Sequence, residues 1–243
     1  MKVVIPMAGK GSRFASAGYT TPKPLIPVAG KPMVKWAIES VIRATDAKEN
    51  DFIFILHKDH IDQYDIKNKM MEIIPDATFV LDDKTDGAAS AVYRSKDYVD
   101  AEEELFITDS DQYFVLNNFK NSRNKALEND HAGIIATFQA DSPAYSYAEL
   151  DENGYVKRTA EKEVISDHAA IGAYYFTKSK YFMESIEFMM ENKLLTRGEY
   201  YVCPVYNEVI KRGKVTIIDA DFWMTMGTPE EKKKFEESIK KNG

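Results

Sequence analysis

The chain has 243 residues, 44% hydrophobic and 29% charged, a balance typical of a soluble globular domain. Its formal net charge of -7 has the wrong sign for a protein that coats nucleic acid, so a few well-placed cations must bind any anionic ligand. Cys203 is the only cysteine, which excludes an internal disulfide and metal sites built from several thiolates. We therefore expect a cytoplasmic protein with no membrane segment and no nucleic-acid partner.

Strands and helices are predicted to alternate through the first part of the chain. Apolar, β-branched runs predict strands at 2–6, 51–56, 77–81, 105–108 and 134–138. Helical spacing of apolar residues predicts helices at 32–45, 61–74 and 88–99, the first beginning at Pro32. This alternation is typical of βαβ units around a parallel sheet.

The second half of the chain adds an antiparallel part. Asn153-Gly154 predicts a hairpin between strands at 147–150 and 155–159. Further strands are expected at 170–176 and 215–218, and helices at 181–190, 201–211 and 229–241. We predict a single α/β domain over 1–243 with a mixed sheet and an antiparallel insertion at about 140–200. Ligands of such sheets bind beyond the carboxyl ends of the strands.

A glycine-rich loop follows the first predicted strand. Ala8-Gly9-Lys10-Gly11-Ser12-Arg13 can bring backbone N–H groups close to a phosphate. The loop is neither a dinucleotide-binding fingerprint, because Phe14 replaces the third glycine, nor a Walker loop. In isolation, the pattern favours a glycine-rich surface turn over a phosphate-binding loop.

The segment after this loop favours a phosphate-binding role for the loop. Pro22 to Met33 reads PKPLIPVAGKPM, and its prolines stiffen the backbone around Lys23. Together the two segments resemble the opening signature of the nucleotidyltransferases that make nucleoside-diphosphate sugars. The resemblance implies a Rossmann-like, GT-A-like fold of the nucleotide-diphospho-sugar transferase type. It also implies that Ala8, Gly9, Gly11 and Ser12 bind the triphosphate, and that Arg13 and Lys23 are catalytic.

Two carboxylates follow the strand at 105–108. Asp109 and Asp111 are two residues apart, so they point to the same side of an extended chain, and carboxylate oxygens suit Mg²⁺. The stretch is similar to the family's metal-binding segment, with Asp111 in the metal role and Asp109 as a second candidate. Asp-x-Asp also occurs in glycosyltransferases that use nucleotide sugars, so this motif alone does not separate the two classes.

Later motifs carry the resemblance across nearly the whole chain. It implies that the phosphorylated acceptor contacts Glu161, Lys162, Gly172 and Glu199, and that Gly87, within Thr85 to Ser90, lies against the base. Trp223 to Pro229 departs from the family pattern, because Thr225 stands where many members carry a second metal-binding aspartate. Asp219 and Asp221 are alternatives on the same strand end, and we list Asp221 as the second metal ligand.

These motifs predict transfer of a nucleoside monophosphate from an NTP to a phosphorylated acceptor, with release of pyrophosphate and with Mg²⁺ as cofactor. The short chain resembles members associated with capsule and other surface polysaccharides. The resemblance to that subgroup favours CTP, with UTP and dTTP as alternatives, and leaves open a sugar 1-phosphate, phosphocholine or a phosphorylated amino acid amide as acceptor. Two alternatives remain, a GT-A-type glycosyltransferase and a non-catalytic nucleotide-binding regulator. The sequence is compatible with a homo-oligomer.

Overall fold

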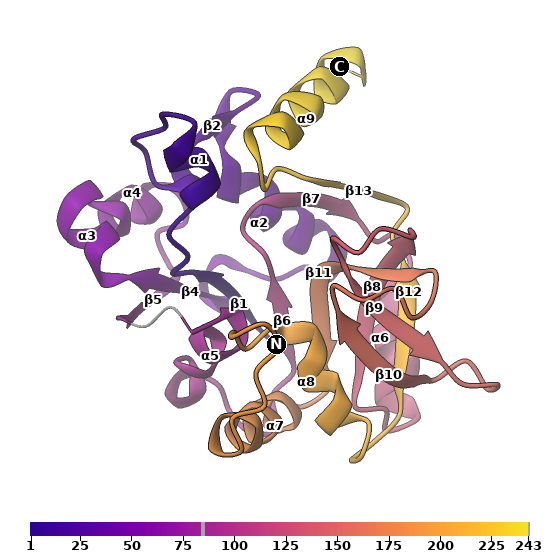
Figure 1. Ribbon diagram of the computed structural model, residues 1–243. Coiled ribbons are helices and arrows are strands. Elements are labelled where there is room, and N and C mark those ends of the chain that lie inside the picture. The colour runs from indigo at the N-terminus through magenta and orange to yellow at the C-terminus, as the bar shows by residue number, and fades with distance from the viewer. Residues whose placement is uncertain (84–85, 243) are drawn as a thin grey trace.

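The computed structural model describes residues 1–83 and 86–242 (Figure 1). The strands are β1 Lys2–Met7, β2 Pro27–Val28, β3 Lys31–Pro32, β4 Phe52–His57, β5 Thr78–Asp82, β6 Leu105–Thr108, β7 Gln112–Val115, β8 Gly133–Gln139, β9 Ser146–Leu150, β10 Val156–Glu161, β11 His168–Phe176, β12 Val215–Asp219 and β13 Phe222–Thr225. The α-helices are α1 Ser12–Ser16, α2 Met33–Thr45, α3 Lys58–Tyr64, α4 Ile66–Ile73, α5 Ala88–Tyr93, α6 Phe119–Glu128, α7 Ser179–Glu191, α8 Val202–Val209 and α9 Pro229–Asn242. Short 3-10 helices lie at Lys23–Leu25, Glu49–Asp51 and Lys96–Tyr98.

A mixed sheet forms the centre of the molecule. Its strand order is β10-β9-β11-β6-β1-β4-β5, with β8 paired to β11 and β12 paired to β8. β1 lies parallel to both β4 and β6, and β4 lies parallel to β5, whereas β11 runs antiparallel to β6. The α/β fold with a mixed sheet is therefore confirmed, and so is the antiparallel hairpin β9-β10 across Asn153-Gly154.

Two layers of helices cover the sheet, because alternate residues of a strand point to opposite faces. In β1, Val4 packs with α5, α7 and α8, whereas Val3 and Ile5 pack with α2, α4 and α6. Figure 1 shows α7 and α8 together at the lower end of this view. Within the described residues, no helix has the length and apolar character that crossing a bilayer requires.

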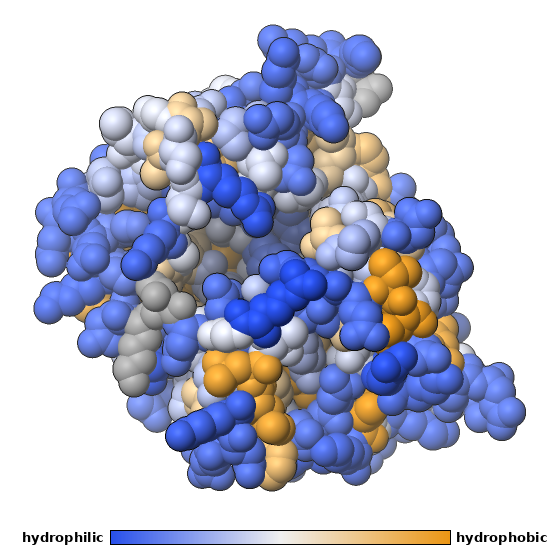
Figure 2. Space-filling model, viewed as in Figure 1, coloured by the Kyte–Doolittle hydropathy of each residue, from blue (hydrophilic) through white to orange (hydrophobic). Residues whose placement is uncertain are grey.

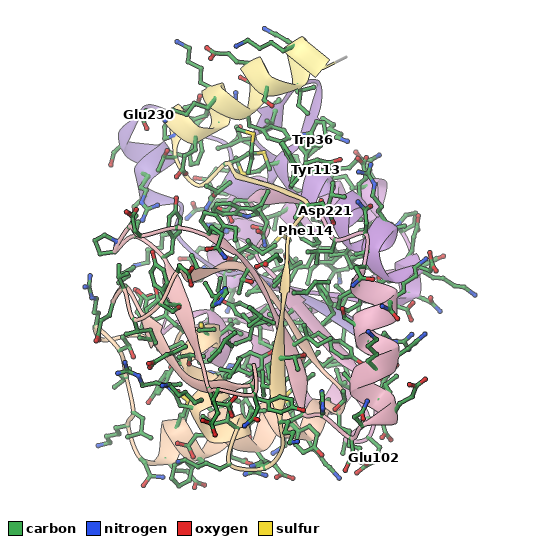
Figure 3. All side chains as sticks on the ribbon, turned by 90° about the vertical axis from the view of Figure 1, so that its right-hand side faces the viewer. Trp36, Glu102, Tyr113, Phe114, Asp221 and Glu230 are labelled. Carbon is green, nitrogen blue, oxygen red and sulfur yellow. The ribbon has the colours of Figure 1, made fainter. Side chains whose placement is uncertain are left out.

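A smaller, separate core joins the two ends of the chain. Phe14 of α1, Trp36 of α2 and Phe235 of α9 are buried together, and the rings of Trp36 and Phe235 lie 4.9 Å apart. Figure 3 shows Trp36 and Tyr113 beneath α9, and their rings are 5.4 Å apart. This cluster fixes the glycine loop relative to the C-terminal helix.

Several element boundaries differ from the sequence predictions. The predicted helix at 61–74 is two helices, because Asp65 adopts a left-handed conformation with φ of 54° between α3 and α4. The predicted helix at 88–99 ends as an α-helix at Tyr93. The sequence did not predict β7 and β13, which pair antiparallel with each other as a separate two-stranded sheet. Thr85 lies outside the described residues.

Glu104 connects three parts of the fold just before β6. Its carboxylate accepts hydrogen bonds from Arg123 of α6, through both oxygens, and from the Tyr175 hydroxyl of β11. Burial alone would raise the pKa of Glu104, but these hydrogen bonds hold it below its ordinary value.

We predict that Glu104→Gln lowers the free energy of unfolding by about 1 to 2 kcal/mol at neutral pH, because it loses charge-assisted hydrogen bonds. A carboxyl with a lowered pKa stabilises the fold above its unfolded pKa of 4.5 and loses that effect as pH falls further. The difference between wild type and variant in urea unfolding should therefore shrink below pH 4.5. A difference that stays constant down to pH 3 would contradict this account.

Candidate active site

Two cavities meet where the carboxyl ends of β1 and β6 lie side by side. The first has a volume of about 480 Å³ and is lined by the glycine loop, by the start of α5 and by Asp109 and Glu199. The second has a volume of about 380 Å³ and lies toward β11, β13 and the start of α8. Asp109 lines both cavities, so their contents are within reach of each other. Figure 2 shows a hollow in the middle of this face of the molecule.

The glycine loop turns sharply into α1. Gly11 has a φ of +61°, and its carbonyl oxygen accepts hydrogen bonds from Phe14 and Ala15 at 3.0 and 3.1 Å. A Cβ at this position would lie 3.3 Å from the Cβ of Lys23, so glycine allows Lys23 to approach the loop. Gly9 faces open space. The predicted residues Ala8, Gly9, Gly11 and Ser12 all line the first cavity.

Gly87 closes the other side of this cavity. A Cβ there would lie 2.4 Å from the backbone oxygen of Tyr200, and Gly87 has a φ of +129°. The two segments are joined by hydrogen bonds from Tyr200 N to Asp86 O at 2.8 Å and from Ala89 N to Tyr200 O at 2.9 Å. Glu199 therefore lies beside Gly87 in the cavity of the glycine loop. The sequence prediction had placed Glu199 with the acceptor residues.

An ion pair lies between the two cavities. Lys23 donates a hydrogen bond to the Oδ2 atom of Asp111. Lys23, Asp109 and Asp111 line a third, smaller cavity of about 170 Å³ together with Gly9 and Gly11. The residues predicted to act on the phosphates and on the metal thus come together, although 88 residues of chain separate Lys23 from Asp111.

Asp109 is the most perturbed carboxyl of the site. Desolvation of its carboxyl by the surrounding protein and the nearby carboxylate of Asp111 raise its pKa to about 7, while the ammonium of Lys23 opposes the shift. The residue as a whole is nonetheless exposed to the cavities that it lines. Gly172 allows this packing, because a Cβ there would lie 2.3 Å from Oδ2 of Asp109. Gly172 has a φ of +78° and lies where the register between β11 and β8 shifts.

The second cavity is acidic and aromatic. Its lining includes Arg13, the carboxylates Asp109, Asp111, Glu161 and Glu231, and the rings of Tyr145, Tyr174, Tyr201 and Trp223. Burial raises the pKa of Glu161 above its ordinary value, although Ser146 donates a hydrogen bond to its carboxylate. Lys162 lies at the margin, where its Nζ atom donates to the Tyr201 hydroxyl at 3.0 Å. Glu161, Lys162 and Gly172, the other predicted acceptor residues, therefore lie in or beside this cavity.

Oxygen atoms suited to a divalent cation surround Gly227. A Cβ on Gly227 would lie 3.0 Å from Asp111 Oδ2, 3.2 Å from Glu231 Oε2 and 3.3 Å from Thr225 Oγ1. A magnesium site commonly uses one or two carboxylates, with water and substrate phosphates completing the shell. Asp111 and Glu231, with the Thr225 hydroxyl, fit such an ion. No cluster of three or more histidine, cysteine or acidic residues suited to a metal occurs among the described residues.

The structure does not bring Asp221 to this site. Its backbone N–H donates to Val115 O at 3.0 Å, and its carboxylate accepts from Asn117 N at 2.8 Å. β13 runs antiparallel to β7, so Thr225 pairs with Gln112, next to Asp111, while Asp221 lies at the opposite end of this strand pair. In Figure 3, Asp221 lies near Phe114. The prediction of Asp221 as a metal ligand beside Asp111 therefore fails on geometry.

Sequence reasoning missed several residues that line the second cavity, namely Gln112, Tyr145, Ser146, Trp223 and Glu231. Trp223 begins the segment from Trp223 to Pro229, which the sequence analysis considered only because Thr225 replaces an expected aspartate there. The sequence contained no comparable signal for Glu231, which reaches the cavity from the first turn of α9. The packing of α9 against β13 and against the core formed by Phe14, Trp36 and Phe235 brings it there.

Residues 2–241 match the model of the nucleotidyl transferase family, and the chain belongs to this family. A bifunctional protein GlmU of Methanocaldococcus jannaschii is 27% identical over 237 residues, which cover 94% of this chain and 52% of that protein. A low-salt glycan biosynthesis nucleotidyltransferase, Agl11 of Haloferax volcanii, is 24% identical over 238 residues, which cover 95% of this chain and 64% of that protein. The chain thus spans about half to two thirds of the length of these relatives.

Solved structures agree with the family in fold. A nucleoside-diphosphate-sugar pyrophosphorylase from Vibrio cholerae superposes with a TM-score of 0.80 at 25% identity, covering 97% of this chain and 99% of the other. A structure described as a glucose-1-phosphate thymidylyltransferase from Bacillus anthracis has a TM-score of 0.79 at 24% identity, covering 98% and 94%. The Rossmann-like fold expected from the sequence is confirmed.

We predict that Asp109→Asn changes the pH dependence of stability in metal-free protein. Between pH 3.8 and about 7, folded wild type holds a proton that the unfolded chain releases, so its stability falls as pH rises through this range. Asparagine carries no charge, so the stability of the variant should rise relative to that of wild type between pH 4 and 8. Urea unfolding in EDTA at several pH values measures this gain. A pH-independent difference would contradict it.

Proposed function

We propose that this protein transfers a nucleoside monophosphate from an NTP to a phosphorylated acceptor and releases pyrophosphate. The observation that carries the proposal is the position of Lys23, Asp109 and Asp111 between the glycine-loop cavity and the acidic, aromatic cavity. The first cavity suits the triphosphate, because backbone N–H groups and Lys10 line it. The second then accepts the phosphorylated substrate. Membership of the nucleotidyl transferase family supports the same reaction.

In this reaction an acceptor phosphate oxygen attacks the α-phosphorus of the NTP, and the bond to the pyrophosphate oxygen breaks. A phosphate monoester is already mostly dianionic at neutral pH, since its second pKa is about 6, so no general base is needed. Catalysis then depends on positioning and on stabilising the charge that develops on pyrophosphate. Lys23, in the small cavity between the two larger ones, and Arg13, which lines the second cavity, provide positive charge near the phosphates, and Lys162 provides it at the acceptor.

We assign the divalent cation, Mg²⁺, to Asp111 and Glu231, with the Thr225 hydroxyl beside them. The close approach of these oxygens at Gly227 supports the assignment. When bound, the cation stabilises negative charge on the phosphates. Lys23 pairs with the same Oδ2 atom of Asp111, so a cation there frees its ammonium for the phosphates. Glu231 thus takes the role that the sequence analysis gave to Asp221.

The name of the similar Bacillus anthracis structure, a glucose-1-phosphate thymidylyltransferase, supports a sugar 1-phosphate as acceptor and dTTP as nucleotide, with UTP and CTP as alternatives. A second candidate acceptor carries an ammonium group, as phosphocholine and phosphorylated amino acid amides do. The excess of carboxylates over cations in the second cavity favours it, and Tyr145 and Trp223 add aromatic faces that attract such a cation. CTP and a role in capsule synthesis rest on the resemblance to the short subgroup alone, whereas a cytoplasmic location rests on the single cysteine, Cys203.

The test is pyrophosphate release with Mg²⁺, using ATP, GTP, CTP, UTP and dTTP against sugar 1-phosphates, phosphocholine and phosphorylated amino acid derivatives. The proposal predicts release that requires one NTP and one acceptor together. Consumption of a nucleotide sugar without pyrophosphate would support a glycosyltransferase instead. Nucleotide binding without turnover on the whole panel would support a non-catalytic regulator.

We predict that Arg13→Ala lowers kcat by about 100-fold or more, because charge stabilisation of the transition state is lost. The matched control is Arg158→Ala on the β9-β10 hairpin, where the arginine is exposed and pairs only with Glu149 in the contacts recorded. This control should stay within about twofold of wild type. Near wild-type turnover of Arg13→Ala under saturating substrates would remove Arg13 from the catalytic set.

We predict that Glu231→Gln weakens binding of Mn²⁺, used as a spectroscopic probe for Mg²⁺, by about tenfold in the presence of NTP, because one anionic ligand is lost. Glu230→Gln is the matched control, since Glu230 is exposed in the same helical turn and the charge change is identical. Electron paramagnetic resonance measures free Mn²⁺ directly and does not require turnover. Equal affinities in both variants would rule out Glu231 as a ligand.

A further inference from the structure

The side chain of Gln112 is buried, with 2% of its surface exposed, and its amide is fully engaged. Nε2 donates hydrogen bonds to Thr108 Oγ1 and to Gly172 O, both at 2.8 Å, and Oε1 accepts one from Trp223 Nε1 at 2.7 Å. A backbone carbonyl can only accept and an indole N–H can only donate. The orientation of the amide is therefore fixed by its partners.

These partners belong to different parts of the fold. Thr108 ends β6 and Gly172 lies at the irregular register of β11, both in the central sheet. Trp223 lies in β13, in the separate two-stranded sheet, 111 residues along the chain from Gln112. One side chain thus connects the two sheets at the bottom of the acidic, aromatic cavity.

Gln112, Gly172 and Trp223 also line this cavity together. The Trp223 ring packs against Phe138, with centroids 4.4 Å apart, and against Tyr145 at 5.8 Å. These ring contacts restrict the indole, but they do not by themselves determine the direction of its Nε1–H. The hydrogen bond to Gln112 is directional and sets which edge of the indole faces the cavity.

We propose that Gln112 is a positioning residue for the acceptor. It holds the Trp223 indole and the Gly172 backbone at a fixed separation, and this separation sets the width of the acceptor cavity and its selectivity among acceptors. It contacts the acceptor only through these two groups. The identity of the bound molecule rests on the proposed function, whereas the positioning of Trp223 does not.

The kinetic test compares Gln112→Met, Trp223→Phe and the double variant. Each single variant should raise the acceptor KM by about tenfold, the effect of leaving a buried polar group unpaired, and leave the NTP KM within twofold. The acceptor KM of the double variant should be no higher than that of the more affected single variant, because both substitutions remove the same hydrogen bond between Gln112 and Trp223. Gln63→Met on α3 is the matched control, since Gln63 is exposed there, and its KM values should equal those of wild type. The proposal would be overturned if the two substitutions multiplied their effects on the acceptor KM in the double variant. Equal increases in the acceptor KM and the NTP KM would also overturn it.

A second measurement needs no turnover. Protein labelled with 5-fluorotryptophan contains two fluorine probes, at Trp36 and Trp223. Gln112→Met should move or broaden the ¹⁹F resonance of Trp223 and leave that of Trp36 unchanged, because Trp36 Nε1 donates to Val28 O in the other core. An unchanged Trp223 resonance would overturn the proposal. If wild type is inactive on every acceptor, the proposed function fails, while this spectrum still decides whether Gln112 positions Trp223.

Discussion

The parallel pairing of β1 with β6 is the constraint on which the site depends. Lys2 pairs with Leu105 and Val4 with Ile107, so the chain leaves both strands at the same edge of the sheet. The glycine loop follows one strand and Asp109 and Asp111 follow the other. Two groups of residues that lie about a hundred positions apart thereby face each other across the small cavity that also contains Lys23.

Electrostatic repulsion between its carboxylates and bound phosphates opposes substrate binding at this site. Four carboxylates line the acceptor cavity of a protein that, on our proposal, binds two phosphorylated substrates. The raised pKa of Asp109, the ion pair of Lys23 with Asp111 and the hydrogen bond from Ser146 to Glu161 each reduce this repulsion. A cation at Asp111 and Glu231, as we propose, would reduce it further.

Local signals predicted much of this architecture. Apolar, β-branched runs predicted β1, β4 and β6, and the glycine loop and PKPL segment predicted residues that line the first and third cavities. The pair β7-β13 was missed because its strands have only four residues each and lie outside the regular alternation of strands and helices, each following closely on another strand, β6 or β12. Asp221 was misassigned for the same reason. Without the antiparallel register, nothing shows that Thr225 rather than Asp221 lies beside Asp111.

The central claim is that nucleotide and acceptor occupy adjacent cavities at the same time and react directly. Initial-rate kinetics with both substrates varied test this claim most directly. Simultaneous occupancy predicts double-reciprocal plots whose lines intersect, with no isotope exchange between labelled pyrophosphate and NTP in the absence of acceptor. Parallel lines together with that exchange would show a covalent nucleotidyl-enzyme and would contradict the account.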